Sequence, residues 1–197
     1  MAATSTDQLA EALDATGGLV AGIRDDQWTD ATPCEEWNVR QLLNHLVAGN
    51  RLFARSVRGE AAPPDLTSWA ASDMLGDDAA DAYRKAATEL VEAFARPGAL
   101  EQTVAVPIGE IPGMVALNLR IVEALVHGWD LATATGQAAP HHDEALAEQA
   151  LAFTAAALSD LPTGRRPFGP PQPVADDAPA LDRLAARLGR EVPPGSN

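Results

Sequence analysis

Hydrophobic residues recur at intervals of three and four positions along most of the chain, which is the pattern of amphipathic helices. The first such stripe predicts a helix over residues 6–24, preceded by Ser5 and Gln8 in the S-x-x-Q spacing of a capping box. A second stripe predicts a helix over residues 39–57, with Asn38 as its N-cap. The chain therefore opens with two capped helices.

The same periodicity continues after a proline-containing interruption at residues 59–76, which is predicted to be a long crossover loop. Four further helices are predicted: from Asp77 or Asp78 to residue 94, from residue 113 to 135, from Asp143 to residue 159, and a short one between Asp177 and Gly189. Residues 103–108 resemble a short extended segment, although Pro107 and Gly109 argue against a regular strand. The pattern predicts an all-α chain.

Length and composition support one helical domain. The chain has 197 residues, which is the usual size of a single domain, and only 5% of them are aromatic while 46% are hydrophobic, mostly Ala and Leu. We therefore expect an antiparallel helical bundle that occupies residues 1–197, with its core at about 5–160 and a C-terminal helical extension at 161–197.

Charge and cysteine content restrict the partners and the compartment. The formal charge of −14, with no basic cluster, excludes a nucleic-acid partner, and an anionic substrate would need a local positive centre. Cys34 is the only cysteine, so no internal disulfide is expected. No apolar run reaches about 18 residues and no signal peptide is recognisable, so we expect no membrane span and a cytoplasmic location.

One helix carries polar groups in an apolar setting. Residues 119–131 are apolar on nearly every face, yet Glu123 and His127 stand four positions apart and so project from the same face. His45 lies beside the apolar stripe of the helix at residues 39–57 and can reach the same interior. Two imidazoles and a carboxylate form a ligand set that suits Zn²⁺, Ni²⁺ or Fe²⁺ and leaves positions open for water or substrate.

Spacing alone does not decide between a metal site and simpler roles. A histidine such as His45 is commonly a hydrogen-bonded residue at the edge of a core, and a Glu/His pair at four-residue spacing is commonly a contact along one helix face. Asp130 falls near the Glu123 face and is predicted either to orient a ligand imidazole or to cap or pair with an Arg.

Several other residues have side chains that could react or bind a ligand. Cys34 is expected to be a buried, inert thiol, Trp37 and Trp129 to anchor the core, and His141 and His142 to lie in solvent without binding metal. Three arginines are possible contacts for an anion: Arg51, Arg84 and Arg120.

Two ordered blocks of sequence extend this interpretation. The blocks TPCEEWNVRQLLNHLV at residues 32–47 and VEALVHGWDLA at residues 122–132 resemble the metal-binding domain of the mycothiol-dependent maleylpyruvate isomerase family, in the DinB-like superfamily. The resemblance spans roughly residues 6–159, and the tail is similar to that of shorter actinobacterial members. It does not include the separate C-terminal domain that helps form the substrate site of the full-length isomerase.

The resemblance implies a fold, a metal and a co-substrate. It implies a four-helix core in the cytosol, a divalent ion on His45, Glu123 and His127, and mycothiol as the thiol. We therefore expect a metal-dependent enzyme, acting as a monomer or homodimer, in which the thiol attacks a small electrophile for S-transfer or isomerisation. Zn²⁺ is the expected metal, with Ni²⁺ or Fe²⁺ as alternatives. A metal-dependent hydrolase and a metal-binding or ligand-binding domain without catalysis remain the alternative functions.

Overall fold

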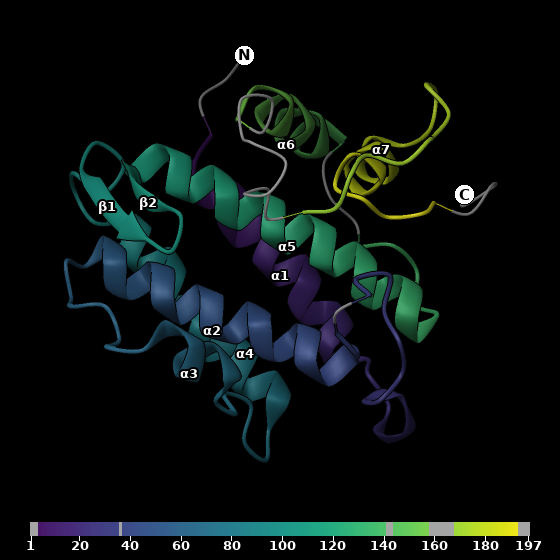
Figure 1. Ribbon diagram of the computed structural model, residues 1–197, viewed down its shortest axis with the longest axis horizontal. Helices are drawn as coiled ribbons and strands as arrows, with labels where there is room; N and C mark the ends of the chain where they lie inside the picture. The colour runs from purple at the N-terminus through teal and green to yellow at the C-terminus, as the bar shows by residue number, and fades with distance from the viewer. Residues whose placement is uncertain (1–3, 36, 141–143, 158–167, 193–197) are drawn as a thin grey trace.

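The computed structural model describes residues 4–35, 37–140, 144–157 and 168–192, and most of these residues are helical. Within them the chain forms seven α-helices and one small sheet (Figure 1). The elements are α1 (Thr6–Ala21), α2 (Val39–Val57), α3 (Leu66–Ala71), α4 (Ala79–Phe94), β1 (Thr103–Val106), β2 (Gly109–Pro112), α5 (Gly113–Thr135), α6 (Glu144–Ala157) and α7 (Ala180–Arg187).

Four long helices enclose the main hydrophobic core. Helix α1 packs against α4 and α5, and α2 packs against the same two helices from the other side (Figure 1). The side chains that fill the space between them are buried aliphatic and aromatic residues: Leu9, Leu13, Leu42, Leu43, Leu46, Tyr83, Leu90, Phe94, Leu117, Ile121 and Leu125. Burial of this apolar surface is the main source of stability for such an arrangement.

Several helix ends form as the sequence predicts. The Ser5 hydroxyl accepts a hydrogen bond from the backbone N–H of Gln8, and the Gln8 side chain accepts one from Ser5 in return. Asn38 and Gln41 form the same reciprocal box at the start of α2. Such boxes satisfy N–H groups that have no partner inside the helix. Helix α5 ends at Gly136, whose left-handed φ of 65° favours glycine.

The first helix is shorter than predicted. It ends at Ala21 with Gly22 as its C-cap, and Asp25–Gln27 form a separate 3₁₀ turn. The side chain of Gln27 holds this turn in place, because it donates to the backbone carbonyl of Thr135 at the end of α5, 2.8 Å away. The segment after α1 is therefore bonded to the end of α5 as a separate turn and does not continue the helix.

The protein is mostly helical, as predicted, and its small sheet is an antiparallel hairpin of β1 and β2 at residues 103–112, which begins in the segment predicted to be extended. Val104 and Val106 are buried on one face of β1, which makes the strand amphipathic. Pro107 lies in the turn, and Gly109 begins β2 with a φ of 122°, so these two residues form the reversal between the strands. The crossover segment also differs from the predicted loop, because Asp65 caps the short helix α3 within it.

The C-terminal helices pack on α5. In Figure 1, α6 and α7 lie above α5 while α2 lies below it, and contacts join α6, α7 and α5. The predicted Asp177 cap for the last helix is wrong: α7 begins at Ala180, whose N–H donates to the Glu144 side chain of α6 at 2.8 Å. The predicted start of α6 at Asp143 and its end near residue 159 lie outside the described residues.

None of the described helices combines the length and the apolar character that crossing a bilayer requires.

The capping box of α2 predicts a measurable stability difference. Replacing Asn38 with Ala removes the acceptor for the Gln41 N–H and should lower the free energy of unfolding by about 1 kcal/mol. Urea denaturation followed by circular dichroism measures this change. The control Asn38→Ser keeps an acceptor and should stay within a few tenths of a kcal/mol of the parent. Equal losses in the two variants would contradict a capping role.

Candidate metal centre

The three predicted metal ligands meet in the interior between α2 and α5. His45 comes from the middle of α2, and Glu123 and His127 come from one face of α5. The Glu123 Oε2 atom lies 3.1 Å from Nε2 of His45 and 3.2 Å from Nε2 of His127. One carboxylate oxygen therefore stands between two imidazole nitrogens.

The packing around the two imidazoles sets their orientation. The Trp37 ring stacks on His45 with 4.3 Å between ring centroids and 25° between planes. The His45 and His127 rings stand nearly perpendicular, at 80°, with their centroids 5.2 Å apart. Glu123 and His127 project together because they are one helical turn apart on α5. Trp37, predicted as a core anchor, is half-buried and forms a wall of this centre.

The geometry of these three residues fits a divalent metal ion. Their ligand atoms all lie within 4.8 Å of one another. Ligand atoms bound to one Zn²⁺ at about 2.1 Å in tetrahedral geometry would be about 3.4 Å apart, close to the two separations around Glu123. The donor set of two nitrogens and one oxygen leaves a fourth position free, which is the arrangement of a catalytic rather than a closed structural site.

The electrostatics of the centre are dominated by burial and by mutual hydrogen bonding. Burial alone would raise the pKa of the Glu123 carboxyl, but hydrogen bonds from His127 and His45 outweigh it and hold this pKa well below its usual range. Burial lowers the pKa of His45 despite its bond to Glu123. For His127 burial acts in the same direction, yet bonds to Asp130 and Glu123 raise its pKa overall. Glu123 is thus a charged carboxylate that is available to a cation.

Asp130 lies behind His127, on the side away from Glu123. Its Oδ2 is 2.9 Å from Nδ1 of His127, so the other ring nitrogen, Nε2, faces Glu123. Asp130 is completely buried and is also held by Arg190, whose Nη2 and Nε lie 2.8 and 3.1 Å from its two oxygens. Asp130 therefore contacts both kinds of partner that the sequence analysis left open, the imidazole of His127 on one side and an arginine on the other.

Arg120 adds a second buried charge beside the centre. Its Nη1 lies 4.0 Å from Glu123 Oε2, and its Nη2 donates to Asn50 Oδ1 at 2.7 Å. The guanidinium also lies over the Phe53 ring, 5.1 Å from its centroid. A Cβ atom at Gly49 would come within 2.8 Å of Nη1, so glycine at this position makes room for the arginine.

A pocket of about 980 Å³ opens onto this centre. His45, Glu123 and Arg120 line it beside the centre, further polar side chains line it between α2 and α3, and most of its walls are formed by apolar and aromatic side chains. They include Trp37, Leu52, Phe53, Leu66, Trp69, Ile108, Leu119 and Phe168, drawn from α2, α3, the hairpin turn, α5 and the C-terminal segment. Ligand sites typically have such apolar walls with a few polar groups at one point.

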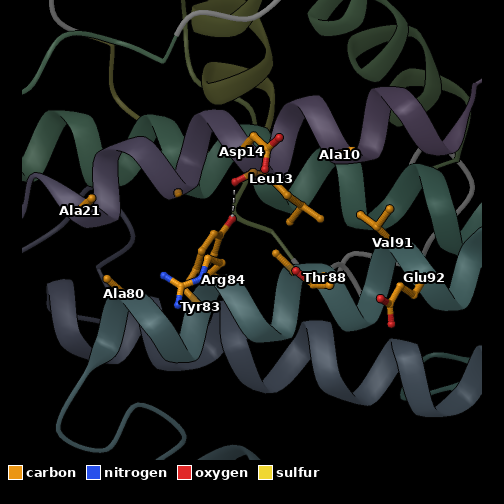
Figure 2. A pocket seen from close by; sticks show the side chains of 12 residues that line it. Ala10, Leu13, Asp14, Ala21, Ala80, Tyr83, Arg84, Thr88, Val91 and Glu92 are labelled. Carbon is orange, nitrogen blue, oxygen red and sulfur yellow. Dashed lines mark hydrogen bonds between the residues drawn. The ribbon is translucent and has the colours of Figure 1, made fainter.

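Two of the three candidate arginines lie away from the centre. Arg84 lines a separate hollow of about 410 Å³ between α1 and α4, shown in Figure 2. There the Tyr83 hydroxyl donates to the Leu13 carbonyl at 3.2 Å, drawn as a dashed line. Arg51 contacts the sulfur of Met74 at 3.6 Å. Arg120 alone of the three lines the larger pocket.

The remaining residues singled out in the sequence lie in different parts of the fold. Trp129 is buried, as predicted for a core anchor, and its indole N–H donates to Asp182 at 2.8 Å. Cys34 is half-buried, and the fold brings its sulfur within 4.8 Å of ligand atoms of His127 and Asp130, although no histidine is near it in sequence. His141 and His142 lie outside the described residues.

Arg190 is the part of the centre that the sequence analysis missed. It follows α7 and lies 60 residues from its partner Asp130. The available signal was weak: an arginine directly after Gly189, the glycine that ends a helix. No periodicity connects such a residue with a helix earlier in the chain.

Comparisons with known proteins identify the family of this chain. The profile described as mycothiol maleylpyruvate isomerase N-terminal domain matches residues 9–132. The chain belongs to this family. Two relatives from Mycobacterium tuberculosis, uncharacterized protein MT0763 of strain CDC 1551 / Oshkosh and uncharacterized protein Rv0738 of strain H37Rv, are each 36% identical over 181 residues, covering 92% of this chain and 94% of theirs.

The fold of this family member is also similar to solved structures. The crystal structure of the mycothiol-dependent maleylpyruvate isomerase superposes with a TM-score of 0.56 at 17% identity, over 77% of this chain and 68% of that chain. A mutant of the same isomerase gives a TM-score of 0.57 at 16% identity, with the same coverage. The matched family region includes the three candidate ligands and Asp130, whereas Arg190 lies beyond it.

The pKa directions of this family member predict how the stability of its metal-free form depends on pH. Because the folded pKa of His127 is raised above 6.5, its stabilising contribution is fully present below that pH and is lost as pH rises through the raised value. The contribution of Glu123 is present above 4.5 and is lost only as pH falls through its depressed value. Both contributions are therefore present between 4.5 and 6.5.

Urea denaturation of the parent and of His127→Gln, both in chelator, tests this expectation. The stability difference between the two proteins should be larger at about pH 5.5 than at about pH 9. A difference that stays constant or grows with pH would contradict the raised pKa. Metal binding should show the opposite dependence and strengthen with pH, because a ligand histidine must be neutral.

Proposed function

We propose that this protein is a metal-dependent enzyme of thiol chemistry, with a divalent ion held by His45, Glu123 and His127. The observation that carries the proposal is the position of Glu123 Oε2 between two imidazole nitrogens, at 3.1 and 3.2 Å, where the large pocket opens. Zn²⁺ is the proposed metal because it favours a four-coordinate site with nitrogen and oxygen ligands; Ni²⁺ or Fe²⁺ would also accept this set.

The proposed ion explains why the pocket would act on thiols. A divalent cation favours the deprotonated form of a bound thiol, which supplies a nucleophile near neutral pH. The thiolate adds to a small electrophile. If the adduct is the product, the reaction is an S-transfer. If the electrophile is an alkene, the addition makes its carbon–carbon double bond single; rotation about that bond, followed by loss of the thiolate, restores the double bond and completes an isomerisation.

The residues of the chain have separate tasks in this proposal. Asp130 holds the Nδ1 side of His127, so that Nε2 stays directed at the ion. Trp37 stacks on His45 and limits its rotation. Arg120 provides a fixed positive charge in the pocket. The lining also contains Arg40 and Asp73, which form an ion pair at 3.1 Å and so compensate each other's charge. Because Glu123 balances Arg120, it is the divalent ion that would give the pocket the net positive charge an anionic ligand needs, despite the overall charge of −14.

We propose mycothiol as the thiol, in keeping with the family to which the chain belongs. The pocket of about 980 Å³ is at the upper end of the range for small-molecule sites and has room for a thiol that carries sugar groups. In this proposal residues 1–197 act as one DinB-like domain, an antiparallel four-helix bundle with a C-terminal extension, working in the cytoplasm where thiols stay reduced.

The first test is metal stoichiometry. Purified protein should contain about one divalent ion per chain by elemental analysis, because one three-ligand set is available. His45→Ala and His127→Ala, verified as folded by circular dichroism, should each lose the ion. The double variant His141→Ala/His142→Ala is the control and should retain it. Retention of the ion by folded His45→Ala and His127→Ala would refute the assignment of the site.

The second test separates thiol chemistry from water activation. Addition of mycothiol to Co²⁺-substituted protein at neutral pH should produce a sulfur-to-metal charge-transfer band, because coordination favours the thiolate below the thiol's own pKa of about 8.5. Mycothiol should reach half-saturation at a lower concentration than glutathione, since its sugar groups add contacts with the pocket.

His127→Ala is the control for this experiment and should show no band. If millimolar mycothiol and glutathione both leave the Co²⁺ spectrum of the parent unchanged, the thiol mechanism is refuted. Hydrolysis of generic esters and amides by the same metal-loaded sample would then support the hydrolase alternative, and its absence would support a non-catalytic metal-binding domain.

A further inference from the structure

Arg190 connects the C-terminal segment to the candidate metal centre. Its side chain is almost completely buried, and three of its donors have defined partners. Nε and Nη2 donate to the two oxygens of Asp130, at 3.1 and 2.8 Å, and Nη1 donates to the backbone carbonyl of Leu188 at 2.8 Å. Such a two-point contact fixes the plane of a carboxylate as well as its position.

The end of α7 directs this arginine toward Asp130. The N–H of Arg190 bonds to the carbonyl of Ala185, and the N–H of Gly189 bonds to that of Ala186, which is the hydrogen-bond pattern of a Schellman motif. Gly189 has a φ of 93°, and a Cβ there would lie 2.7 Å from the Cα of Gly169. Glycine at this position therefore permits both the reversal of the chain and its close packing.

Helix α7 is itself held against α5. The Trp129 indole donates to Asp182 of α7 at 2.8 Å, and Leu184 and Leu188 are fully buried. Two consecutive residues of α5, Trp129 and Asp130, are thus both bonded to the C-terminal segment. His127 precedes Asp130 by three residues, about one turn of α5.

We propose that Arg190 is a positioning residue of the metal centre, which fixes Asp130 so that His127 presents Nε2 to the ion. This inference rests on the proposed metal site. Asp130 Oδ2 accepts from both His127 Nδ1 and Arg190 Nη2, so the arginine determines which oxygen faces the imidazole and at what angle. Without Arg190, the carboxylate would be free to turn about its side-chain bonds, and the imidazole would lose its fixed partner. The C-terminal segment then contributes a positioning residue to the metal centre.

Metal affinity measures this role directly. Competition with a chromophoric chelator gives the Zn²⁺ dissociation constant of the full-length parent and of Arg190→Met. We expect Arg190→Met to bind Zn²⁺ about 10–100-fold more weakly, the usual effect of removing a partner behind a ligand. Arg190→Lys, which keeps the charge but not the two-point contact, should show a smaller loss. Arg187→Met is the matched control, because Arg187 lies on α7 and contacts Thr154 of α6; it should bind as the parent does.

A double-mutant cycle distinguishes positioning from general stabilisation. If Arg190 acts through Asp130, then Arg190→Met should cause little further loss of affinity in an Asp130→Asn background. Additive losses would overturn the proposal, as would a folded Arg190→Met with the affinity of the parent. Should Arg190→Met fail to fold, Arg190→Lys and Gly189→Ala supply the test, since Gly189→Ala displaces the arginine without removing it. Parental affinity in both would overturn the inference.

The same measurements separate this inference from the proposed function. If the parent itself binds no Zn²⁺, the metal site and the role of Arg190 are both refuted. If the parent binds Zn²⁺ and the Arg190 variants match it, only the inference fails.

Discussion

A carboxylate buried between helices needs partners, and in this protein Glu123 determines much of what surrounds it. An ionised carboxylate removed from water costs several kcal/mol unless hydrogen bonds and opposite charges compensate for it. His45 and His127 supply hydrogen bonds to one oxygen, and Arg120 places a positive charge 4.0 Å away. These groups come from the two helices that line the interior, so satisfying one side chain also fixes how α2 and α5 face each other.

A second buried carboxylate, Asp130, lies farther from the pocket and also needs partners. Asp130 is fully buried, and it is compensated by His127 on one side and by Arg190 on the other. His127 therefore has acidic groups at both ring nitrogens, an arrangement that holds the imidazole in one orientation. The charged groups form a continuous series from Arg190 through Asp130 and His127 to Glu123 and His45. At one end of this series, Arg190 belongs to the C-terminal segment; at the other end, Glu123 and His45 line the pocket.

The local charge differs in character from that of the chain as a whole. The surface of a protein with a formal charge of −14 repels anions at long range. In the pocket, however, charges of both signs are present: Arg120 lies 4.0 Å from the Glu123 carboxylate, and Arg40 pairs with Asp73. Electrostatic interactions are stronger in a partly buried site than at the surface. A small anion that enters would therefore meet the buried guanidinium of Arg120, which offsets the long-range repulsion locally.

The amino-acid sequence by itself determined the features that depend on neighbours within a few positions. The capping boxes at Ser5 and Asn38 are examples, because cap and partner are three residues apart. The shared face of Glu123 and His127 is another, since one helical turn separates them. Hydrophobic periodicity likewise identified the long helices, although it placed the end of α1 too late and overlooked α3.

Only the tertiary structure decided which of these local features meet. The hairpin of β1 and β2 buries two valines, and Pro107 and Gly109 lie at its reversal, so the proline and glycine mark the turn between two strands rather than the absence of a strand. The first helix ends at Ala21, and the turn that follows it is bonded through Gln27 to the end of α5. Arg190 reaches Asp130 across 60 residues because α7 packs on α5 and ends in a left-handed glycine. Local patterns carry no information about such distant pairs, since their meeting depends on how whole helices pack.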